Sequence, residues 1–308
     1  MEDIFYHKLI RIIPGDHIRL NEPMKNHTSL HIGGKADYFA TPKDEEEVKA
    51  VISLCKDENI PYYIMGNGSN LLVSDAGFRG LILQLGDEFQ KASVSEDGVI
   101  TAQAGILLSR LANIAADHSL TGFEFASGIP GTLGGAVTMN AGAYDGEMKQ
   151  CIIAARVLDM DGNLKELSLE SLELGYRTSI LQKENLILLD ARIGLSKGEE
   201  HLIRQKMNDL NAQRRDKQPL DQYSAGSTFK RPVGYFAGKL INDAGLRGYQ
   251  VGGAAVSEKH CGFVINKDNA TAEEFLTVIR DVIRIVEERF GVRLEPEVKF
   301  LGDGLSLN

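Results

Sequence analysis

Two short glycine-rich stretches carry the first chemical signal in this chain of 308 residues. One reads GNGSN at residues 66–70, and the other reads GIPGTLGG at residues 128–135, with Asn140-Ala141-Gly142 close behind. Glycine lets a backbone adopt positive φ angles and approach a ligand without a Cβ in the way. Successive backbone N–H groups can then point at one anion. Two such loops together suit a pyrophosphate, and the alternative is that both are tight structural turns.

The residues expected to contact this ligand are the glycines of the two loops and their small or hydroxyl-bearing neighbours. They are Gly66, Asn67, Gly68, Ser69, Asn70, Gly128, Ile129, Pro130, Gly131, Thr132, Gly134, Gly135, Ala136, Asn140, Ala141 and Gly142. The first loop lacks the third glycine of a GxGxxG motif, which argues against a Rossmann site. The sequence has no CxxC, HExxH or GxxxxGK[ST] motif, so we expect neither a bound metal nor a P-loop.

A mixture of helices and short strands is predicted to hold these loops. The periodicity predicts helices over residues 44–59, 107–120, 198–219 and 271–291. Strands are expected at 60–65, 80–85, 99–105 and 185–195, with a hairpin over 151–169 that turns at Asp161-Gly162. The irregular spacing is not the βα alternation of a barrel or a doubly wound sheet, so the pattern indicates an α+β fold.

The clearest single element is the helix over residues 271–291. Thr271 and Glu274 form a capping box at its start, and Gly291 stands at its end. The apolar stripe along one face comprises Phe275, Val278, Ile279, Val282, Ile283 and Val286.

Composition narrows the class of protein and its partners. A hydrophobic content of 43% and a charged content of 25% are ordinary for a globular protein. The net charge of −9 argues against a nucleic-acid partner. No apolar window is long enough for membrane insertion, and no signal peptide is visible. Three widely spaced cysteines suit free thiols in a reducing compartment, so we expect a cytoplasmic protein.

Seven motifs in a fixed order resemble one family. They are NHTSLHIGGKADYF (26–39), MGNGSNLLVSD (65–75), GIPGTLGGAVTMNAGAYDGEM (128–148), LGYRTS (174–179), AGSTFKRP (225–232), AGKLINDAGLRG (237–248) and LEPEVKFLG (294–302). Together they resemble the bacterial UDP-N-acetylenolpyruvoylglucosamine reductases over nearly the whole chain. Only five residues separate YRTS from NLILLD, so the chain looks like the branch that lacks an extra tyrosine-bearing loop.

The resemblance implies an α+β fold in which NADPH and the substrate bind one after the other. It implies a two-part FAD-binding domain of the vanillyl-alcohol-oxidase (PCMH) type over residues 1–197, divided into about 1–85 and 86–197. A smaller α+β substrate-binding domain is expected over 198–308, with the C-terminal strand 292–302 returning to the active site. It further implies noncovalent FAD, NADPH as reductant, a small-molecule UDP-sugar substrate and a monomer.

The resemblance also assigns three catalytic residues. Reducing an enol ether beside a carboxylate requires a hydride, stabilisation of the developing negative charge, and a proton. No side chain supplies hydride, so a cofactor is obligatory. Ser227 matches the family's proton donor, Arg177 matches the arginine that pairs the substrate carboxylate, and Glu297 matches a third position that orders the site or donates a hydrogen bond when protonated. Glu295 shares a face with Glu297 in an extended segment, so periodicity alone does not separate them.

A basic region follows the FAD-binding part of the chain. Between Arg204 and Gln250 there are nine Lys or Arg against four Asp and no Glu, a local charge of +5 that would attract a diphosphate. Lys217, Tyr223, Lys230 and Arg231 are the expected substrate-binding residues, with Arg231 standing where the other branch has asparagine. The alternative for the helix in this region is a solvated charged face.

Two other functions fit part of the pattern. Another noncovalent FAD oxidoreductase on the same scaffold would share the glycine loops, and so would a non-catalytic nucleotide-binding regulator. Neither needs the combination of Arg177, Ser227 and Glu297. His260 lies outside the matched motifs, and the sequence assigns it no role.

Overall fold

The computed structural model describes residues 3–307, which form two compact units. Unit 1 comprises the described residues up to Arg19 together with Tyr38–Asn67 and Gly80–Arg214. Unit 2 comprises Leu20–Asp37, Gly68–Arg79 and the described residues from Arg215 onward. Each unit has its own hydrophobic core.

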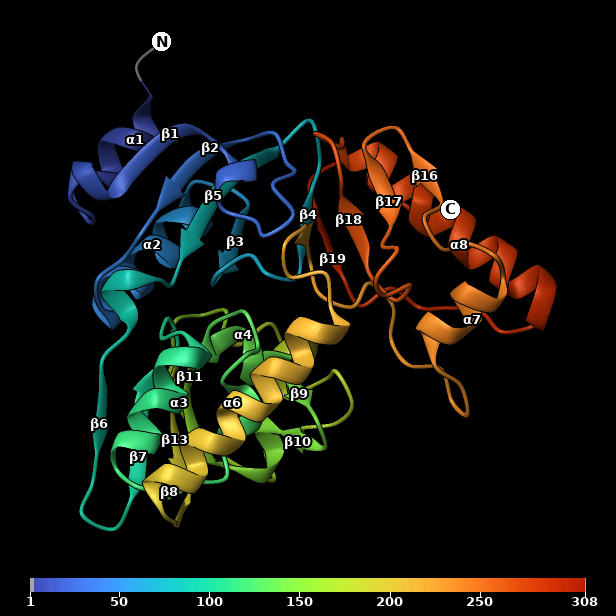
Figure 1. Cartoon of the computed structure of the whole chain (residues 1–308). Coiled ribbons are helices and arrows are strands. Elements are labelled where there is room, and N and C mark those ends of the chain that lie inside the picture. Colours follow the sequence, from blue (N-terminus) through green and yellow to red (C-terminus); the bar gives the residue numbers. More distant parts are fainter. Residues whose placement is uncertain (1–2, 308) are drawn as a thin grey trace. The chain divides into compact units, whose positions relative to one another are not determined.

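Unit 1 contains three small or medium sheets and most of the helices (Figure 1). Its helices are α1 (Ile4–Leu9), α2 (Glu45–Asp57), α3 (Leu108–Asp117), α4 (Leu133–Thr138), α5 (Ile180–Lys183) and most of α6 (Glu200–Lys217). Its strands are β3 (Tyr62–Met65), β6 (Ala92–Val94), β7 (Val99–Gln103), β8 (Leu120–Thr121), β9 (Gly142–Ala143), β10 (Gly146–Glu147), β11 (Ile152–Leu158), β12 (Leu164–Ser168), β13 (Ile187–Gly194) and β14 (Ser196–Lys197).

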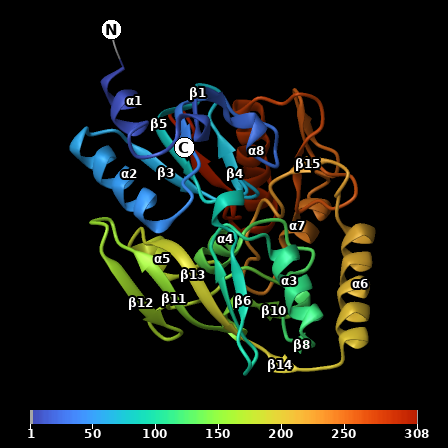
Figure 2. The ribbon, with the colours of Figure 1, turned by 90° about the vertical axis from the view of Figure 1, so that its left-hand side faces the viewer.

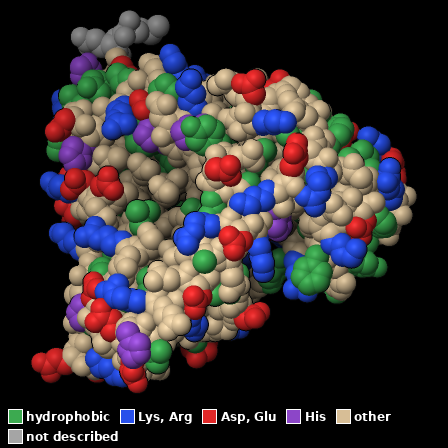
Figure 3. Space-filling view, in the orientation of Figure 1, with side chains coloured by type: hydrophobic (Ala, Val, Ile, Leu, Met, Phe, Trp, Pro, Cys, Tyr) green, Lys and Arg blue, Asp and Glu red, His purple; other side chains and the backbone are tan. Residues whose placement is uncertain are grey.

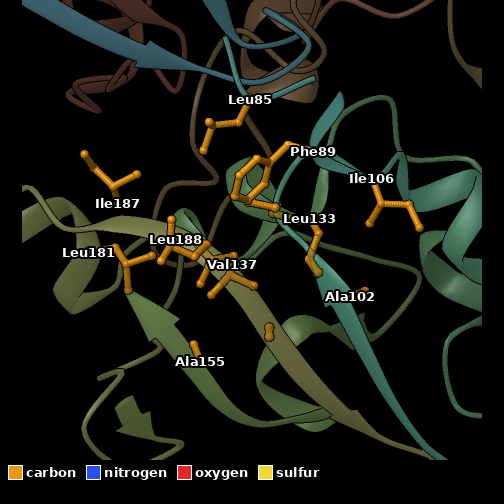
Figure 4. Close-up of a cluster of buried hydrophobic side chains, with 14 of the residues drawn as sticks. Leu85, Phe89, Ala102, Ile106, Leu133, Val137, Ala155, Leu181, Ile187 and Leu188 are labelled. Atoms are coloured by element: carbon orange, nitrogen blue, oxygen red, sulfur yellow. The ribbon is translucent and has the colours of Figure 1, made fainter. Parts of the chain in front are cut away.

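The largest sheet of unit 1 is antiparallel and has the order β12-β11-β13-β7-β6. Figure 2 shows β12, β11 and β13 side by side. The hairpin of β11 and β12 turns where the Asp161-Gly162 pair predicted it, with Gly162 at a φ of 80°. Helix α4 packs on this sheet, and its residues Leu133 and Val137 lie beside Leu188 of β13 (Figure 4).

Three strands carry the chain between the units, namely β1 (Ile18–Pro23), β2 (Lys35–Ala40) and β5 (Phe78–Gln84). They belong to a four-stranded sheet with the order β1-β2-β5-β3, in which β3 and β5 run parallel. Five short 3-10 helices complete the local structure of the described residues, at Gly15–His17, Met24–Asn26, Asp87–Phe89, Glu124–Ala126 and Met148–Gln150.

Unit 2 is built around one long helix and an antiparallel sheet. The sheet has the order β15-β18-β17-β16, and a separate parallel pair joins β19 to β4. The elements are β4 (Leu71–Val73), β15 (Tyr223–Ser224), α7 (Ala237–Asp243), β16 (Gln250–Val251), β17 (Ala254–Val256), β18 (Val264–Asn266), α8 (Ala272–Phe290) and β19 (Lys299–Leu301).

Helix α8 confirms the strongest sequence prediction. Thr271 and Glu274 form the capping box, Gly291 ends the helix at a φ of 64°, and the whole predicted apolar stripe is buried. That stripe packs against β16, β17 and β18. The predicted strand at residues 292–302 is shorter in the structure, where only Lys299–Leu301 pairs as β19.

The structure does not divide the chain at residue 197, where the sequence analysis placed the domain boundary. Helix α6 lies with unit 1 up to Arg214, because Ile203 and Met207 are buried in the core of that unit. Two early segments, residues 20–37 and 68–79, belong to unit 2. Among residues 3–307, no helix is both long and apolar enough to cross a membrane. Charged side chains of both signs are interspersed over the face drawn in Figure 3.

Candidate functional site

The second glycine loop is anchored to the core of unit 1 by α4. The buried side chains of Leu133 and Val137 point into the apolar cluster of Figure 4. The amide of Leu133 donates to the carbonyl of Ile106 at 2.9 Å, and the amide of Gly134 donates to Ala104 at 2.8 Å. A Cβ on Gly134 would lie 3.2 Å from the side chain of Ala104, so the missing side chain lets the loop lie close to the residues that follow β7.

The two glycine loops meet at Gly66 and Thr132. A Cβ on Gly66 would lie 2.2 Å from Oγ1 of Thr132, a distance at which no real Cβ is found. The carbonyl of Gly66 also accepts a hydrogen bond from Nε2 of Gln84 at 3.0 Å. Two segments predicted from the sequence to share a ligand are therefore in direct contact within unit 1.

Backbone amides of the second loop are available to a ligand. Within residues 3–307, no atom accepts a hydrogen bond from the N–H of Gly131, Thr132 or Gly135. Gly131 has a φ of 141°, which favours glycine, and a Cβ on Gly135 would meet nothing closer than 4.0 Å. Amide donors on an open glycine surface fit the phosphates of a dinucleotide.

The other predicted contacts of this loop differ in exposure. Pro130 is exposed and Ile129 is half-buried, so both can face a ligand. Ala136 and Ala141 are buried, and the amide of Ala141 donates to the carbonyl of Ala136 at 2.8 Å. Gly142 lies in β9, where a Cβ would come within 2.6 Å of the carbonyl of Gly146. Ala136, Ala141 and Gly142 are therefore packed within the protein and fix the conformation of the loop.

The first glycine loop spans the boundary between the two units. Gly66 and Asn67 belong to unit 1, whereas Gly68, Ser69 and Asn70 belong to unit 2. Gly68 has a φ of 60°, and its carbonyl accepts a hydrogen bond from the amide of Ser29 at 3.2 Å.

A buried arginine supports the start of the second loop, which sequence reasoning missed. Arg214 of α6 is 8% exposed, and its guanidinium donates to the carbonyl of Gly128. Burial lowers the pKa of Arg214, and a hydrogen bond with Tyr144 acts in the opposite direction. A Cβ on Gly128 would lie 2.2 Å from Oδ1 of Asn211, so α6 packs directly on this glycine. The sequence showed these residues only as one face of a charged helix.

Arg177 stands at the tip of a tight turn in unit 1. Gly175 and Thr178 pair across the turn, and Arg177 adopts a left-handed φ of 56°. That conformation costs a non-glycine residue about 1–3 kcal/mol, so the surrounding contacts must hold it. The carbonyl of Arg177 accepts from Nε2 of Gln182 at 3.2 Å, and its Nη2 donates to the carbonyl of Gly142 at 3.5 Å. The predicted carboxylate-binding arginine therefore lies beside the end of the second glycine loop.

Asn140 ties this turn to the glycine loop. Its side chain is 1% exposed and is fully engaged by protein groups. Nδ2 donates to the carbonyl of Gly175 at 3.0 Å and to the carboxylate of Glu147 at 3.0 Å, while Oδ1 accepts from the amide of Lys149 at 2.9 Å. Asn140 has a φ of 43°, a conformation that asparagine tolerates well. Its side chain thus holds the Arg177 turn next to the end of the second glycine loop.

Ser227 lies in an exposed position on a firmly held segment of unit 2. The neighbouring Thr228 is 1% exposed. The amide of Thr228 donates to the carbonyl of Gly262 at 2.8 Å, and its Oγ1 accepts from the amide of Val264 at 2.8 Å. Its carbonyl accepts from the amide of Glu297 at 2.8 Å. These three bonds fix the backbone that presents the Ser227 hydroxyl.

Glu297 and Asn70 lie beside the Ser227 segment in unit 2. Phe229 pairs with Pro296, which sets the Ser227 and Glu297 segments next to each other. Nδ2 of Asn70 donates to the carbonyl of Glu297 at 3.1 Å. The structure thus brings together two of the three predicted catalytic residues and one predicted cofactor residue. Arg177 belongs to unit 1.

Lysines supply positive charge around Glu297. Burial lowers the pKa of Lys299, the charge of Lys230 lowers it further, and Glu297 raises it. Nζ of Lys230 also forms an ion pair with Glu295 at 3.2 Å. Glu295 therefore has a structural partner of its own. Lys299 was not singled out from the sequence, because a lone lysine in a short strand carries no pattern.

The remaining predicted substrate residues all belong to unit 2 and are exposed. Lys217 lies at the end of α6. Tyr223 is 53% exposed and stacks on the ring of His31, with ring centroids 3.9 Å apart. The guanidinium of Arg231 lies 4.0 Å from the ring centroid of Phe236.

Comparisons with known proteins identify the fold and the family. Residues 36–168 match the family of FAD binding domains, and residues 218–301 match the C-terminal domain of UDP-N-acetylenolpyruvoylglucosamine reductase. A crystal structure of UDP-N-acetylenolpyruvylglucosamine reductase from Thermus caldophilus superposes with a TM-score of 0.79 at 35% identity, covering 92% of this chain and 100% of that chain. The α+β fold, with an FAD-binding domain and a separate C-terminal domain, is therefore confirmed. This fold and the match to FAD binding domains define an FAD-dependent oxidoreductase.

Two curated relatives give the particular family. UDP-N-acetylenolpyruvoylglucosamine reductase of Lachnoclostridium phytofermentans is 55% identical over 306 residues, which is 98% of this chain and 99% of the relative. The protein of the same name from Clostridioides difficile strain 630 is 51% identical over 298 residues, covering 97% of this chain and 98% of the relative. The chain belongs to the UDP-N-acetylenolpyruvoylglucosamine reductase family.

Proposed function

We propose that this chain reduces UDP-N-acetylglucosamine enolpyruvate to UDP-N-acetylmuramate, a step in the synthesis of peptidoglycan precursors. FAD is the cofactor and NADPH the reductant. The enzyme works in the cytoplasm as a monomer. The full-length similarity to reductases of this name supports the reaction, and the match to FAD-binding domains supports the cofactor.

Both glycine loops are proposed to hold the cofactor. The amides of Gly131, Thr132 and Gly135 are the candidate donors to its pyrophosphate, and the open surface of Gly135 gives it room. FAD held there would supply the hydride for the substrate double bond. The loops would position it through these amides.

Arg177 is proposed to bind the substrate carboxylate. A guanidinium fork fits a carboxylate with two parallel hydrogen bonds and stays charged at every working pH. Charge that develops on the carboxylate during reduction is stabilised most strongly by a donor already in place. The left-handed turn of Arg177, held by Gln182 and by the turn's bond to Asn140, supports this role.

Ser227 is proposed to deliver the proton to the substrate carbon, with Glu297 ordering the site. A hydroxyl is a weak acid, so it needs positive surroundings that stabilise the alkoxide left behind. Lys230 and Lys299 lie on the segments beside these two residues. The observation that carries the proposal is the hydrogen bond between Glu297 and Thr228, which sets the backbones of Ser227 and Glu297 side by side.

Exposed groups of unit 2 are proposed to bind the nucleotide part of the substrate. Lys217, Lys230 and Arg231 would pair with its diphosphate. One face of the Tyr223 ring stacks on His31. The opposite face would suit stacking with the planar base of the nucleotide.

The replacement Ser227→Ala tests the assignment by separating the two half-reactions. NADPH is expected to reduce the bound flavin at the normal rate, because that step needs no proton from Ser227. Reoxidation by the enolpyruvyl nucleotide is expected to fall by about two orders of magnitude or more. Ser93→Ala, at an exposed serine of β6, is the matched control and should leave both rates unchanged.

Three results would each contradict part of the proposal. Normal reoxidation in Ser227→Ala would take the proton-donor role away from Ser227. Wild-type protein whose reduced flavin is reoxidised by oxygen but not by the enolpyruvyl nucleotide would instead be another FAD oxidoreductase on this scaffold. Protein that binds FAD but accepts no electrons from NADPH would fit a regulator.

A further inference from the structure

His260 is a half-buried histidine of unit 2 that the proposed reaction does not use. Its Nδ1 lies 3.1 Å from the backbone nitrogen of Gly262. A backbone N–H is always a donor, so Nδ1 must be the acceptor, which places the ring proton on Nε2. The ring also packs edge-on against Phe263, with ring centroids 5.0 Å apart. This residue therefore has one fixed tautomer and one fixed orientation.

Gly262 and the imidazole are in direct contact. A Cβ on Gly262 would lie 2.9 Å from Cε1 and 3.1 Å from Nδ1 of His260, so a side chain at this position would displace the ring. The ring also lies against α7, where a Cβ on Gly238 would come within 3.4 Å of Cε1. Glycine at both positions lets the imidazole sit between the two backbones.

From Gly262 the contacts lead to both proposed catalytic residues. The carbonyl of Gly262 accepts from the amide of Thr228, which is the amide that directly follows Ser227. The carbonyl of Thr228 accepts in turn from the amide of Glu297. Each of these two bonds is 2.8 Å long. His260 thus stands at one end of a continuous series of hydrogen bonds that ends at Glu297.

We propose that neutral His260 is a positioning residue for Ser227 and Glu297, acting through Gly262 and Thr228. The inference rests on the proposed function for the roles of those two residues. When Nδ1 gains a proton it becomes a donor that faces the donor N–H of Gly262. The turn from His260 to Phe263 must then rearrange, and the carbonyl of Gly262 leaves the amide of Thr228. Protonation therefore loosens the segment that presents the Ser227 hydroxyl.

The surroundings of His260 favour the neutral form. Burial lowers its pKa from the ordinary 6.5, and the positive charge of Arg247 lowers it further, against an opposing backbone hydrogen bond. Among the described residues, the charge that lowers the pKa of His260 comes from Arg247, which lies on another segment. The guanidinium of Arg247 donates a hydrogen bond to the carbonyl of Glu258. On its own segment, Nζ of Lys259 donates to the carbonyl of Arg215 at 2.6 Å.

The sign of the pH effect follows from this shift. Because the pKa of folded His260 lies below its unfolded value, the folded form releases the proton. The stability that the neutral ring contributes is present above the ordinary pKa of 6.5 and is lost as the pH falls below it. The catalytic step that uses Ser227 is expected to weaken as the pH falls through the folded-state pKa of His260, which lies below 6.5.

His260→Asn and His260→Ala separate positioning from general packing. The Oδ1 of asparagine can replace Nδ1 as an acceptor but cannot be protonated in this range, whereas alanine removes the acceptor. At pH 7.5 we expect His260→Ala to lower the rate of flavin reoxidation by the enolpyruvyl nucleotide about tenfold, and His260→Asn to retain most of it. Reduction of the flavin by NADPH should stay within about twofold in both. His201→Ala, at an exposed histidine of α6, is the control.

Two further measurements decide the outcome. His260→Asn should lose the acidic decline in the reoxidation rate that the wild type shows. Hydrogen–deuterium exchange needs no substrate, so it tests the link even when the proposed reaction is wrong. In wild-type holoenzyme, peptides covering residues 226–230 and 260–264 should exchange faster at the acidic end of a series that runs from pH 7.5 to about pH 4.5, after correction for the intrinsic rate. Unchanged protection of both peptides in His260→Ala, or an identical acidic decline in His260→Asn, would overturn the inference. When His260→Ala fails to fold, the wild-type exchange data and His260→Asn still decide it.

Discussion

The replacement Gly66→Ala tests whether the contact between the two glycine loops shapes the FAD site. The added Cβ would lie 2.2 Å from Oγ1 of Thr132, whereas ordinary contact begins at 3.4 Å. The loops must separate by the difference, about 1.2 Å, or Thr132 must leave its rotamer. Thr132 is buried and β-branched, so its rotamer is stiff. Overpacking of this kind costs about 1–3 kcal/mol.

This cost is divided between two measurable quantities. If the two loops separate in the free protein, its stability falls. If they must come together again to bind FAD, the affinity for FAD falls. A full cost of about 1–3 kcal/mol in binding corresponds to a dissociation constant that is roughly 5-fold to 150-fold higher. We would measure FAD dissociation by the quenching of flavin fluorescence and apoprotein stability by urea unfolding. The two free-energy changes together should equal the predicted total.

The double variant Gly66→Ala with Thr132→Ala provides the decisive comparison. It removes Oγ1 and leaves Cβ of residue 132 at 3.3 Å from the new methyl group, so most of the loss should be recovered. Gly15→Ala is the matched control, because a Cβ there meets nothing within 4 Å. The reasoning is refuted when Gly66→Ala binds FAD and unfolds like the wild type, or when the double variant is no better than the single one.

Four further results are expected. Asn140→Ala should destabilise the protein by roughly 2–5 kcal/mol in urea unfolding, because it removes three hydrogen bonds of a buried side chain. Asn140→Asp should lose stability as the pH rises from 4 to 8, since the new carboxylate faces Glu147; a flat pH dependence would contradict the geometry. Burial raises the pKa of Cys55 and Cys151 to about 12, so both thiols should resist alkylation at pH 8 until urea unfolds the chain. The stability that depends on the neutral thiols should fall between pH 9 and 12. Fast alkylation of the native protein would show that these thiols are accessible. Thr271→Ala should cost about 1 kcal/mol through loss of the cap on α8, and an unchanged urea midpoint would deny the cap a role.

Regular elements with strong local signals could be predicted from the sequence. Helix α8 carries its own start, stripe and stop, and the β11–β12 hairpin carries its turn pair, so local chemistry alone defines them. Apart from β19, which lies within the predicted strand 292–302, the strands of unit 2 could not be found in this way. β15 and β16 are two residues long, and β4 pairs in parallel with β19 from the far end of the chain. Such pairings depend on tertiary contacts and leave no local period.

The site shows the same division between local and long-range information. The glycine loops and the motifs at Arg177, Ser227 and Glu297 are contiguous in sequence, so they could be singled out. The residues that support them could not. Arg214 under Gly128 and His260 under Gly262 act through backbone carbonyls and amides that any residue possesses. Only the fold shows which backbone group each side chain reaches.

The transfer of electrons from reduced flavin to the enolpyruvyl nucleotide tests the central claim most directly. Purified holoenzyme is reduced anaerobically with one equivalent of NADPH, and the substrate is then added while the flavin absorbance is followed. The proposed function predicts that the oxidised flavin spectrum returns, with one molecule of UDP-N-acetylmuramate formed for each flavin. A flavin that stays reduced in the presence of excess enolpyruvyl nucleotide would contradict it.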